Sequence, residues 1–169
     1  MLLPICAEAL DIGASTGGFT QVLLEAGVAR VTAIDVGHGQ MEAKLAADPR
    51  VRLIEGLNAR DLTADHLPAA PEIIVCDVSF ISLRLALPRA LALALPGAHL
   101  VALIKPQFEV GPEAVGKGGI VRDATAQDGA VRDVARFLAE SGWTVLGTIA
   151  SPIAGGDGNR EFLIAARKR

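Results

Sequence analysis

The chain is poor in cysteine, in aromatic residues and in positive charge. Its 169 residues include two cysteines, one tryptophan and no tyrosine, and 16 lysines and arginines stand against 19 aspartates and glutamates, a formal charge of −3. Two cysteines without a Cys/His cluster at ligand spacing exclude a disulfide scaffold and a metal site, and favour a reducing, cytoplasmic setting. The acidic balance excludes nucleic-acid binding through bulk charge, so any such affinity must be local or come from outside this chain.

Uninterrupted apolar runs are also missing. Residues 83–104 are rich in Leu and Ala, but Arg84 and Arg89 interrupt them, and Pro96-Gly97 predicts a turn that separates a helix from a strand. No signal-peptide pattern is visible before the first predicted strand. We therefore expect neither a membrane-spanning segment nor a membrane partner. The basic residues 167–169 are expected to form a solvated end.

Apolar residues make up 51% of the chain, enough for a large core in one domain, 1–169. Predicted strands alternate with predicted helices, which is typical of an α/β fold with a mostly parallel sheet covered on both faces. The last two strands have no helix between them and are expected to form an antiparallel hairpin. The predicted strands are 8–12, 30–35, 51–55, 72–77, 99–104, 143–150 and 161–166, and the predicted helices are 17–26, 41–47, 83–95 and 124–141.

Residues 10–20 have the pattern of a strand, a tight glycine turn and a helix start. Glycines allow positive φ and close approach of a ligand, and the start of a helix offers unpaired N–H groups to an anionic group. This predicts a nucleotide-type cofactor pocket, although a turn that only packs a helix on a sheet is the alternative. The spacing departs from the G-x-G-x-x-G dinucleotide fingerprint. The predicted cofactor-binding residues here are Asp11, Gly13, Ala14, Ser15, Thr16, Gly17, Gly18 and Phe19.

Charged residues stand at the ends of several predicted strands. Asp77 ends the fourth strand and Lys105 follows the fifth, while Glu161 opens the last strand, which runs the other way. Because the carboxyl ends of parallel strands share one edge of the sheet, these side chains are expected to converge there. They are the candidate catalytic residues, and a salt-bridged structural trio is the alternative.

Further cofactor contacts are expected at the same edge. A carboxylate at the tip of the second strand accepts hydrogen bonds from the ribose hydroxyls of an adenosine cofactor, which makes Asp35, with Val36 beside it, a predicted binding position. Asn58 is placed to contact an adenine edge, and a turn-forming Asn explains it almost as well. The glycine-rich segment 111–119 has no apolar period and is a candidate lid or substrate flap.

Six runs of residues occur in an order that resembles the hemolysin A family of the TlyA type. They are LDIGASTGGFT (10–20), AIDVGHGQ (33–40), DVSFISL (77–83), KPQFE (105–109), GKGGIVRD (116–123) and SPIAGGDGNREF (151–162). The catalytic domain of that family is similar to the FtsJ RNA methyltransferases. The resemblance therefore implies a class I, Rossmann-like methyltransferase fold of seven strands, S-adenosylmethionine as cofactor, and 2′-O-methylation of cytidine ribose in ribosomal RNA.

The resemblance also implies roles for individual residues. The family has a catalytic Lys-Asp-Lys-Glu tetrad, whose last three members match Asp77, Lys105 and Glu161, and Asp77 is expected to contact the cofactor as well. The first lysine lies upstream of the glycine turn in the family, beside an N-terminal RNA-binding domain, and has no counterpart here. We therefore expect this chain to correspond to the catalytic domain alone, and to bind ribosomal RNA or ribosomal subunits weakly without that domain.

Other functions stay open at this point. A lysine can hold a ribose hydroxyl or accept its proton, and the sequence does not decide between these roles for Lys105. The chain could be a cofactor-binding module that is inactive alone, or, following the family's name, a membrane-active hemolysin. A nicotinamide-dependent oxidoreductase is disfavoured by the departure from the dinucleotide fingerprint. A base amino-methyltransferase is disfavoured because residues 77–80, DVSF, contain no proline.

Overall fold

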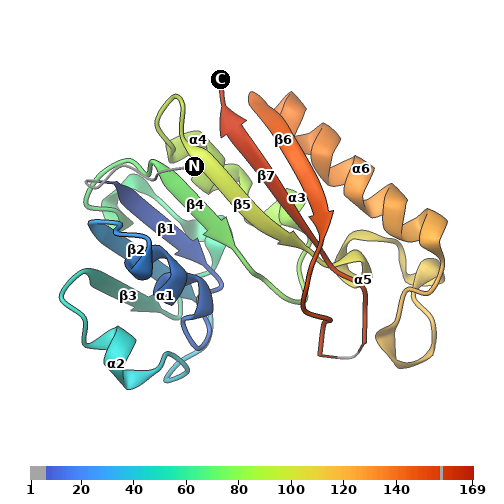
Figure 1. The fold of residues 1–169 in the computed structure, drawn as a ribbon, viewed down its shortest axis with the longest axis horizontal. Helices are drawn as coiled ribbons and strands as arrows, with labels where there is room; N and C mark the ends of the chain where they lie inside the picture. Colours follow the sequence, from blue (N-terminus) through green and yellow to red (C-terminus); the bar gives the residue numbers. More distant parts are fainter. Residues whose placement is uncertain (1–6, 157) are drawn as a thin grey trace.

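A seven-stranded sheet forms the centre of the computed structural model, which describes residues 7–156 and 158–169 (Figure 1). The strand order is β3-β2-β1-β4-β5-β7-β6. Strands β1 to β5 pair in parallel, and β7 runs antiparallel to both β5 and β6. The predicted seven-stranded α/β fold and its C-terminal hairpin are thus confirmed. The strands are β1 Glu8–Ile12, β2 Arg30–Asp35, β3 Val51–Glu55, β4 Ile73–Cys76, β5 His99–Ile104, β6 Trp143–Ala150 and β7 Phe162–Lys168.

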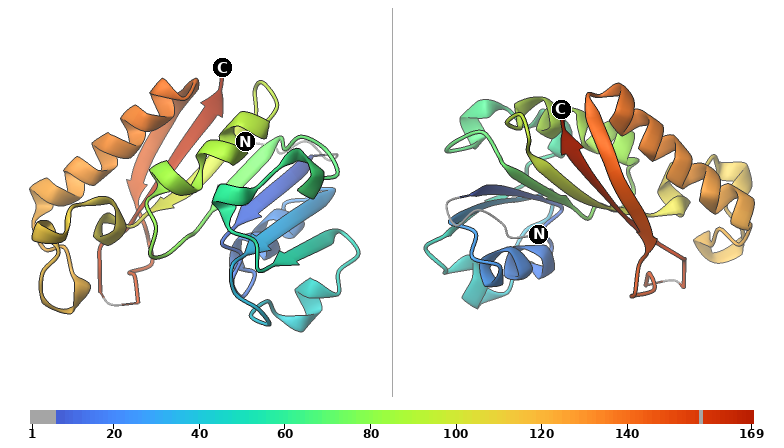
Figure 2. Two further views of the ribbon diagram at one scale, coloured as in Figure 1. Left: turned by 180° about the vertical axis from the view of Figure 1, so that it is seen from behind. Right: turned by 45° about the horizontal axis from the view of Figure 1, so that its top comes forward.

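The helices lie on the two faces of the sheet in unequal numbers. Helix α1 packs on one face, and α3, α4 and α6 pack on the other, as the two views of Figure 2 make clear. Among the described residues, no helix has the length and apolar character to cross a membrane. The helices are α1 Gly18–Glu25, α2 Ala43–Ala46, α3 Leu83–Ala86, α4 Pro88–Leu93, α5 Pro106–Glu109 and α6 Ala124–Glu140. The described residues also form 3-10 turns between β3 and β4, Ala59–Asp61 and Ala64–His66, and between α5 and α6, Pro112–Ala114 and Lys117–Gly119.

One predicted helix is divided in two. The sequence pattern predicts a continuous helix over 83–95, whereas the structure has α3 up to Ala86 and a new helix, α4, from Pro88. Proline has no N–H to donate to the carbonyl four residues earlier and its ring collides with that carbonyl, so Pro88 ends one helix and starts the next.

Among the described residues, the predicted coverage of both faces does not extend to the last three strands. The face of β5, β7 and β6 that is turned toward the viewer in Figure 1 carries no helix from the described residues. The cross-strand row of Leu103, Leu163 and Ile149 lies on that face, and Ile149 is 63% exposed. The crossovers that contain α3, α4 and α6 all cover the opposite face, which leaves this row without a cover.

The core is divided by the sheet into two apolar clusters. One lies between the sheet and α3, α4 and α6, and it contains Trp143 and Cys76, both 0% exposed. The other lies between the sheet and α1 and contains Leu23 and Val31. The interpretation of Cys76 as a core residue is confirmed, and Cys6 lies outside the described residues.

Among the basic C-terminal residues, Arg167 and Arg169 are exposed as expected for a solvated end, whereas Lys168 is partly buried and attached to the fold. The Lys168 ammonium donates hydrogen bonds to the carbonyls of Leu91, Ala92 and Ala94, at 2.9, 3.2 and 2.7 Å. The Arg169 guanidinium donates to the carbonyl of Ala139 at 2.8 Å. These carbonyls belong to the last turns of α4 and α6, where helix C-termini present unpaired acceptors that a cation satisfies well.

Candidate functional site

A cavity of about 860 Å³ opens at the carboxyl ends of β1, β2 and β4. This volume falls within the range of small-molecule sites. The parallel strands bring the cavity walls together from distant parts of the sequence, as expected for a doubly wound sheet. The lining residues are Ile12, Gly13, Ser15, Ile34, Asp35, Val36, Gly37, Gln40, Leu57, Asn58, Ala59, Arg60, Asp77, Val78, Ser79, Phe80, Ile81, Ser82, Leu85, Ala86 and Phe108.

The glycine turn after β1 passes close to the end of β4. Gly13 has φ +77°, and a Cβ atom at this position would lie 2.2 Å from the backbone oxygen of Asp77. The N–H groups of Gly13 and Ala14 donate to the carbonyl of Ile34, at 2.9 and 3.1 Å. The turn is therefore fitted between β2 and β4, and only glycine has both the conformation and the size for position 13.

Asp35 fixes the far side of this turn. Its Oδ2 accepts a hydrogen bond from the Ser15 N–H at 2.7 Å, and its Oδ1 accepts one from the Gly37 N–H at 2.8 Å. Each carboxylate oxygen keeps a second lone pair. The carboxylate is thus held in one orientation at the cavity wall, with capacity to accept hydrogen bonds from a ligand hydroxyl.

The predicted cofactor residues divide into two groups. Gly13, Ser15, Asp35, Val36, Asn58 and Asp77 all line the cavity. The Asn58 side chain is partly engaged, because its Oδ1 accepts a hydrogen bond from the Arg60 N–H at 3.0 Å and caps a 3-10 turn. The other predicted cofactor-binding residues are not among the described residues that line the cavity. They are Asp11, Ala14, Thr16, Gly17, Gly18 and Phe19.

Asp11 lies beneath the turn, with 0% exposure. Its Oδ2 accepts a hydrogen bond from the Thr20 hydroxyl at 2.6 Å, and its Oδ1 has no partner among the described residues. Burial raises the pKa of Asp11 to about 6 against the opposing effect of the Thr20 hydrogen bonds. In this structure the carboxyl links β1 to the first turn of α1.

Lys105 and Asp77 form an ion pair beside the cavity. The Lys105 Nζ lies 2.7 Å from Asp77 Oδ1 and donates a hydrogen bond to Ser79 Oγ at 3.0 Å. The Lys105 side chain is 14% exposed. Because an ammonium has three N–H groups, one remains after these two contacts. The Lys105 ammonium, at the end of β5, therefore lies next to the Asp77 carboxylate and the Ser79 hydroxyl, which belong to the loop after β4.

Glu161 lies near this pair and is 7% exposed. Burial raises the pKa of its carboxyl, and the positive charge of Lys105 acts against this effect. The Gln107 side-chain amide donates to Glu161 Oε1 at 3.5 Å. The three candidate catalytic residues thus meet at one edge of the sheet, as the strand directions predict, with Asp77 in the cavity wall and the other two outside its lining.

Residues 4–168 match the model of the family described as FtsJ-like methyltransferase. The chain belongs to the FtsJ-like methyltransferase family. It is 48% identical over 158 residues to the Mycobacterium tuberculosis protein named 16S/23S rRNA (cytidine-2'-O)-methyltransferase TlyA, a match that covers 94% of this chain and 59% of that protein. The chain thus spans less than two thirds of the length of this relative.

Two solved structures show the same architecture. A Lactococcus lactis protein described as a hemolysin has a TM-score of 0.94 and 43% identity, covering 99% of this chain and 81% of that chain. A Listeria monocytogenes protein described as an S-adenosylmethionine-dependent methyltransferase has a TM-score of 0.72 at 16% identity, covering 99% of this chain and 94% of that chain. The second likeness concerns the fold alone.

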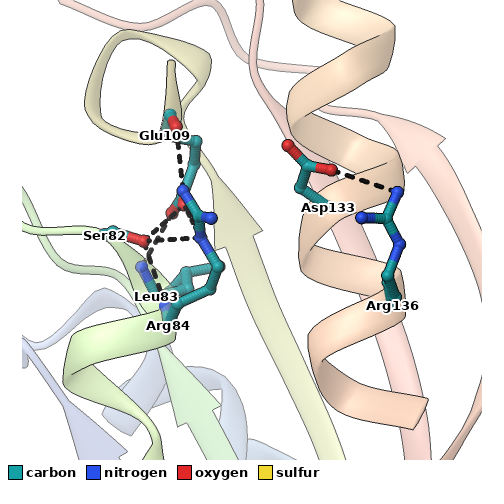
Figure 3. A network of polar contacts seen from close by, with 6 residues as sticks. All are labelled: Ser82, Leu83, Arg84, Glu109, Asp133 and Arg136. Atoms are coloured by element: carbon teal, nitrogen blue, oxygen red, sulfur yellow. Dashed lines mark hydrogen bonds and ion pairs between the residues drawn. The ribbon is translucent and has the colours of Figure 1, made fainter. Parts of the chain in front are cut away.

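Glu109 is a residue of this FtsJ-like domain that the sequence did not single out. Its Oε2 accepts a hydrogen bond from the Ser82 hydroxyl at 2.6 Å and its Oε1 accepts one from the Leu83 N–H at 2.7 Å, while Arg84 reaches both the carboxylate and the Glu109 backbone oxygen (Figure 3). Burial raises the pKa of the carboxyl. Glu109 therefore joins the start of α3 to α5, and α5 follows Lys105 directly.

Phe80 is a second residue that the sequence did not single out as a site residue. It has φ 65°, a left-handed conformation that is rare for a residue with a side chain, and it is 90% exposed. Its ring lies 5.1 Å from the ring of Phe108, with 50° between the planes. The FtsJ-like domain thus presents two aromatic rings at the cavity, Phe80 three positions after Asp77 and Phe108 three positions after Lys105.

Proposed function

We propose that the chain is an S-adenosylmethionine-dependent methyltransferase that acts on the ribose 2′-oxygen of cytidine in ribosomal RNA. The observation that carries the proposal is the Lys105 ammonium, held by Asp77 and Ser79 at the edge of the cavity with Glu161 close by. The name of the M. tuberculosis relative, at 48% identity, supports the same reaction and the same nucleotide. The name of this relative also gives 16S and 23S ribosomal RNA as its substrates, and we extend ribosomal RNA to the present chain as part of the proposal.

The cavity fits the proposed cofactor. Asp35 offers a fixed carboxylate to a ribose diol, and the apolar side chains of Val36, Leu57 and Ile81 offer contacts to an adenine. Gly13 and Asp77 both line the cavity, and the amino-acid end of the cofactor is proposed to lie beside them. S-adenosylmethionine, when bound, supplies an electrophilic methyl group.

The chain's own residues have to align the ribose hydroxyl and accept one proton. A remaining N–H of Lys105 donates to the hydroxyl oxygen and orients it, and such alignment lowers the barrier of an in-line displacement. In this transfer the new C–O bond would form as the methyl–sulfur bond of the donor breaks, with S-adenosylhomocysteine as the leaving group, and the proton of the ribose hydroxyl would move to a base. Glu161 is the proposed acceptor, because a carboxylate whose pKa is raised by burial is a stronger base near neutral pH.

The test is Lys105→Ala, with Lys44→Ala as the control because Lys44 is an exposed lysine of α2. We expect Lys105→Ala to abolish methyl transfer to ribosomal RNA and to leave S-adenosylmethionine binding, measured by calorimetry, within about threefold of the unaltered protein. Lys44→Ala should change neither quantity. Methyl transfer that persists in Lys105→Ala would overturn the proposed role of this residue.

A further inference from the structure

Asn159 is a buried amide that connects two loops far apart in the sequence. The residue is 1% exposed and precedes Glu161 by two positions. Its Nδ2 donates a hydrogen bond to the carbonyl of Gly119 at 2.9 Å, and its Oδ1 accepts one from the N–H of Val121 at 3.0 Å. The Asn159 side chain therefore pairs at once with the carbonyl of Gly119, at the end of the glycine-rich segment 111–119, and with the N–H of Val121, just beyond it.

The glycine-rich segment is fastened at its other side by α6. Gln127, in the first turns of that helix and 8% exposed, donates a hydrogen bond from Nε2 to the carbonyl of Val121 at 2.8 Å. Within the segment, the Gly116 N–H donates to the carbonyl of Ile120 at 2.9 Å. Residues 116–121 are thus tied both to α6 and to the chain before β7.

The segment that contains Asn159 also encloses the Glu161 carboxylate. The Ser151 N–H donates to the backbone oxygen of Glu161 at 2.8 Å, and the Gly155 N–H donates to the backbone oxygen of Asn159 at 3.1 Å. A Cβ atom at Gly155 would lie 2.5 Å from Glu161 Oε1, so the loop backbone packs directly on the carboxylate. The burial of Glu161 therefore depends on where this loop is held.

We propose that Asn159 is a positioning residue for Glu161: by joining residues 119–121 to the loop before β7, it keeps the carboxylate buried and aimed at Lys105. Without the amide, the Val121 N–H and the Gly119 carbonyl have no buried partner, and the two loops separate so that water can hydrate these groups. The role in catalysis rests on the proposed function, whereas the control of Glu161 burial does not depend on it.

The test compares Asn159→Ala with Gln127→Ala in the full chain. The first readout is the pKa of Glu161, followed by carboxyl NMR. The groups that face Glu161 are Lys105 from the end of β5, Asp77 from the end of β4 and the neutral Gln107 from α5, and none of them is altered in either variant. Loss of burial in Asn159→Ala should lower the pKa of Glu161 toward its ordinary value. Gln127→Ala should leave this pKa unchanged, because it releases the segment only from α6.

The second readout is limited trypsin cleavage after Lys117, exposed in the glycine-rich segment 111–119, and after Arg122, exposed just beyond that segment. Loss of two hydrogen bonds should speed this cleavage by about tenfold in Asn159→Ala, by opening the segment locally. Gln127→Ala should also speed it, by a smaller factor. A faster cleavage without a change in the pKa of Glu161 would overturn the proposal, because the Asn159 hydrogen bonds would then hold residues 116–121 in place without affecting Glu161.

The third readout separates this proposal from the proposed function. If methyl transfer occurs, Asn159→Ala should lower kcat and leave the KM for S-adenosylmethionine unchanged, because Glu161 lies outside the cavity lining. If no transfer occurs in the unaltered chain, the NMR and protease results still decide the proposal. Should Asn159→Ala fail to fold, Asn159→Ser keeps a small polar side chain, adds no charge and removes the amide from both Gly119 and Val121, and a pKa of Glu161 unchanged in that variant overturns the proposal.

Discussion

Replacing Asp11 with Asn should make the protein's stability less sensitive to pH. The Asp11 carboxyl is fully buried between β1 and α1, and burial raises its pKa to about 6. In the unfolded chain the same group has a pKa of about 3.9. The folded state therefore binds this proton more tightly than the unfolded state. Its contribution to stability is greatest below the unfolded pKa and is lost as the pH rises through the window from about 4 to about 6.

The size of the effect follows from the two pKa values. With about 6 in the folded state and about 3.9 in the unfolded state, the free energy of unfolding falls by about 2 kcal/mol between pH 4.5 and pH 7.5 through Asp11 alone. The Asn side chain of Asp11→Asn does not titrate and therefore contributes no such fall. Between pH 4.5 and pH 7.5, the free energy of unfolding of the variant should rise by this amount relative to that of the unaltered protein. The raised pKa values of Glu109 and Glu161 contribute to both proteins alike and cancel from the comparison.

Urea unfolding, followed by the fluorescence of the single, fully buried Trp143, measures the two stabilities at pH 4.5 and pH 7.5. Asp48→Asn is the control, because contact with Arg50 at the surface lowers the pKa of Asp48 to about 2. The stability that Asp48 contributes is lost only as the pH falls below about 4, so its replacement should not alter the change between pH 4.5 and pH 7.5. If the free energy of unfolding changes equally with pH in Asp11→Asn and in the unaltered protein, ionisation of the buried Asp11 carboxyl does not destabilise the fold, and the reasoning is refuted.

Three other substitutions test the construction of the site and the core. Gly13→Ala should abolish calorimetric binding of S-adenosylmethionine, because its Cβ would lie 2.2 Å from the backbone oxygen of Asp77 at φ +77°; binding of ordinary strength would show that the turn can move aside. Lys168→Met should lower the free energy of unfolding by about 1–3 kcal/mol in urea, through loss of three hydrogen bonds to carbonyls, and an unchanged midpoint would mean that water replaces the ammonium without cost. Glu109→Ala should cost a similar amount, about 1–3 kcal/mol, since Ser82 and the Leu83 N–H lose a buried acceptor; an unchanged urea midpoint would refute this contribution.

The sheet and the meeting point of the candidate catalytic residues could be predicted because both depend on local pattern and strand direction. The alternation of strands and helices fixes the parallel part of the sheet, and the missing helix between the last strands fixes the hairpin. Once the strands are parallel, Asp77 and Lys105 come to one edge, and Glu161 joins them because β7 runs in the opposite direction.

The place of Asp11 could have been found from the same pattern. Side chains alternate along a strand, so Asp11 lies on the opposite face from Leu10 and Ile12 and beneath α1, where it meets Thr20. The predicted cofactor contact of Asp11 stays a prediction. Likewise, Pro88 carries the signal that divides the helix predicted over 83–95.

Contacts between distant segments could not be predicted in this way. Glu109 meets Ser82 across 27 positions, and Asn159 meets Gly119 across 40. Nothing in the local periodicity of either segment specifies its partner, because these pairings depend on how whole elements pack. The anchoring of Lys168 to α4 is of the same kind, since a terminal basic residue has the same local pattern whether it is solvated or bound.

The most direct test of the central claim is to incubate the chain with ribosomal RNA and methyl-labelled S-adenosylmethionine, and then to hydrolyse the product in alkali. Alkaline cleavage of RNA needs a free 2′-hydroxyl, so a 2′-O-methylated ribose leaves a dinucleotide uncut. The account predicts label in alkali-stable dinucleotides that contain cytidine, and none with Lys105→Ala. Label in mononucleotides, which would mean methylation of a base, or no label with the unaltered chain, would contradict it.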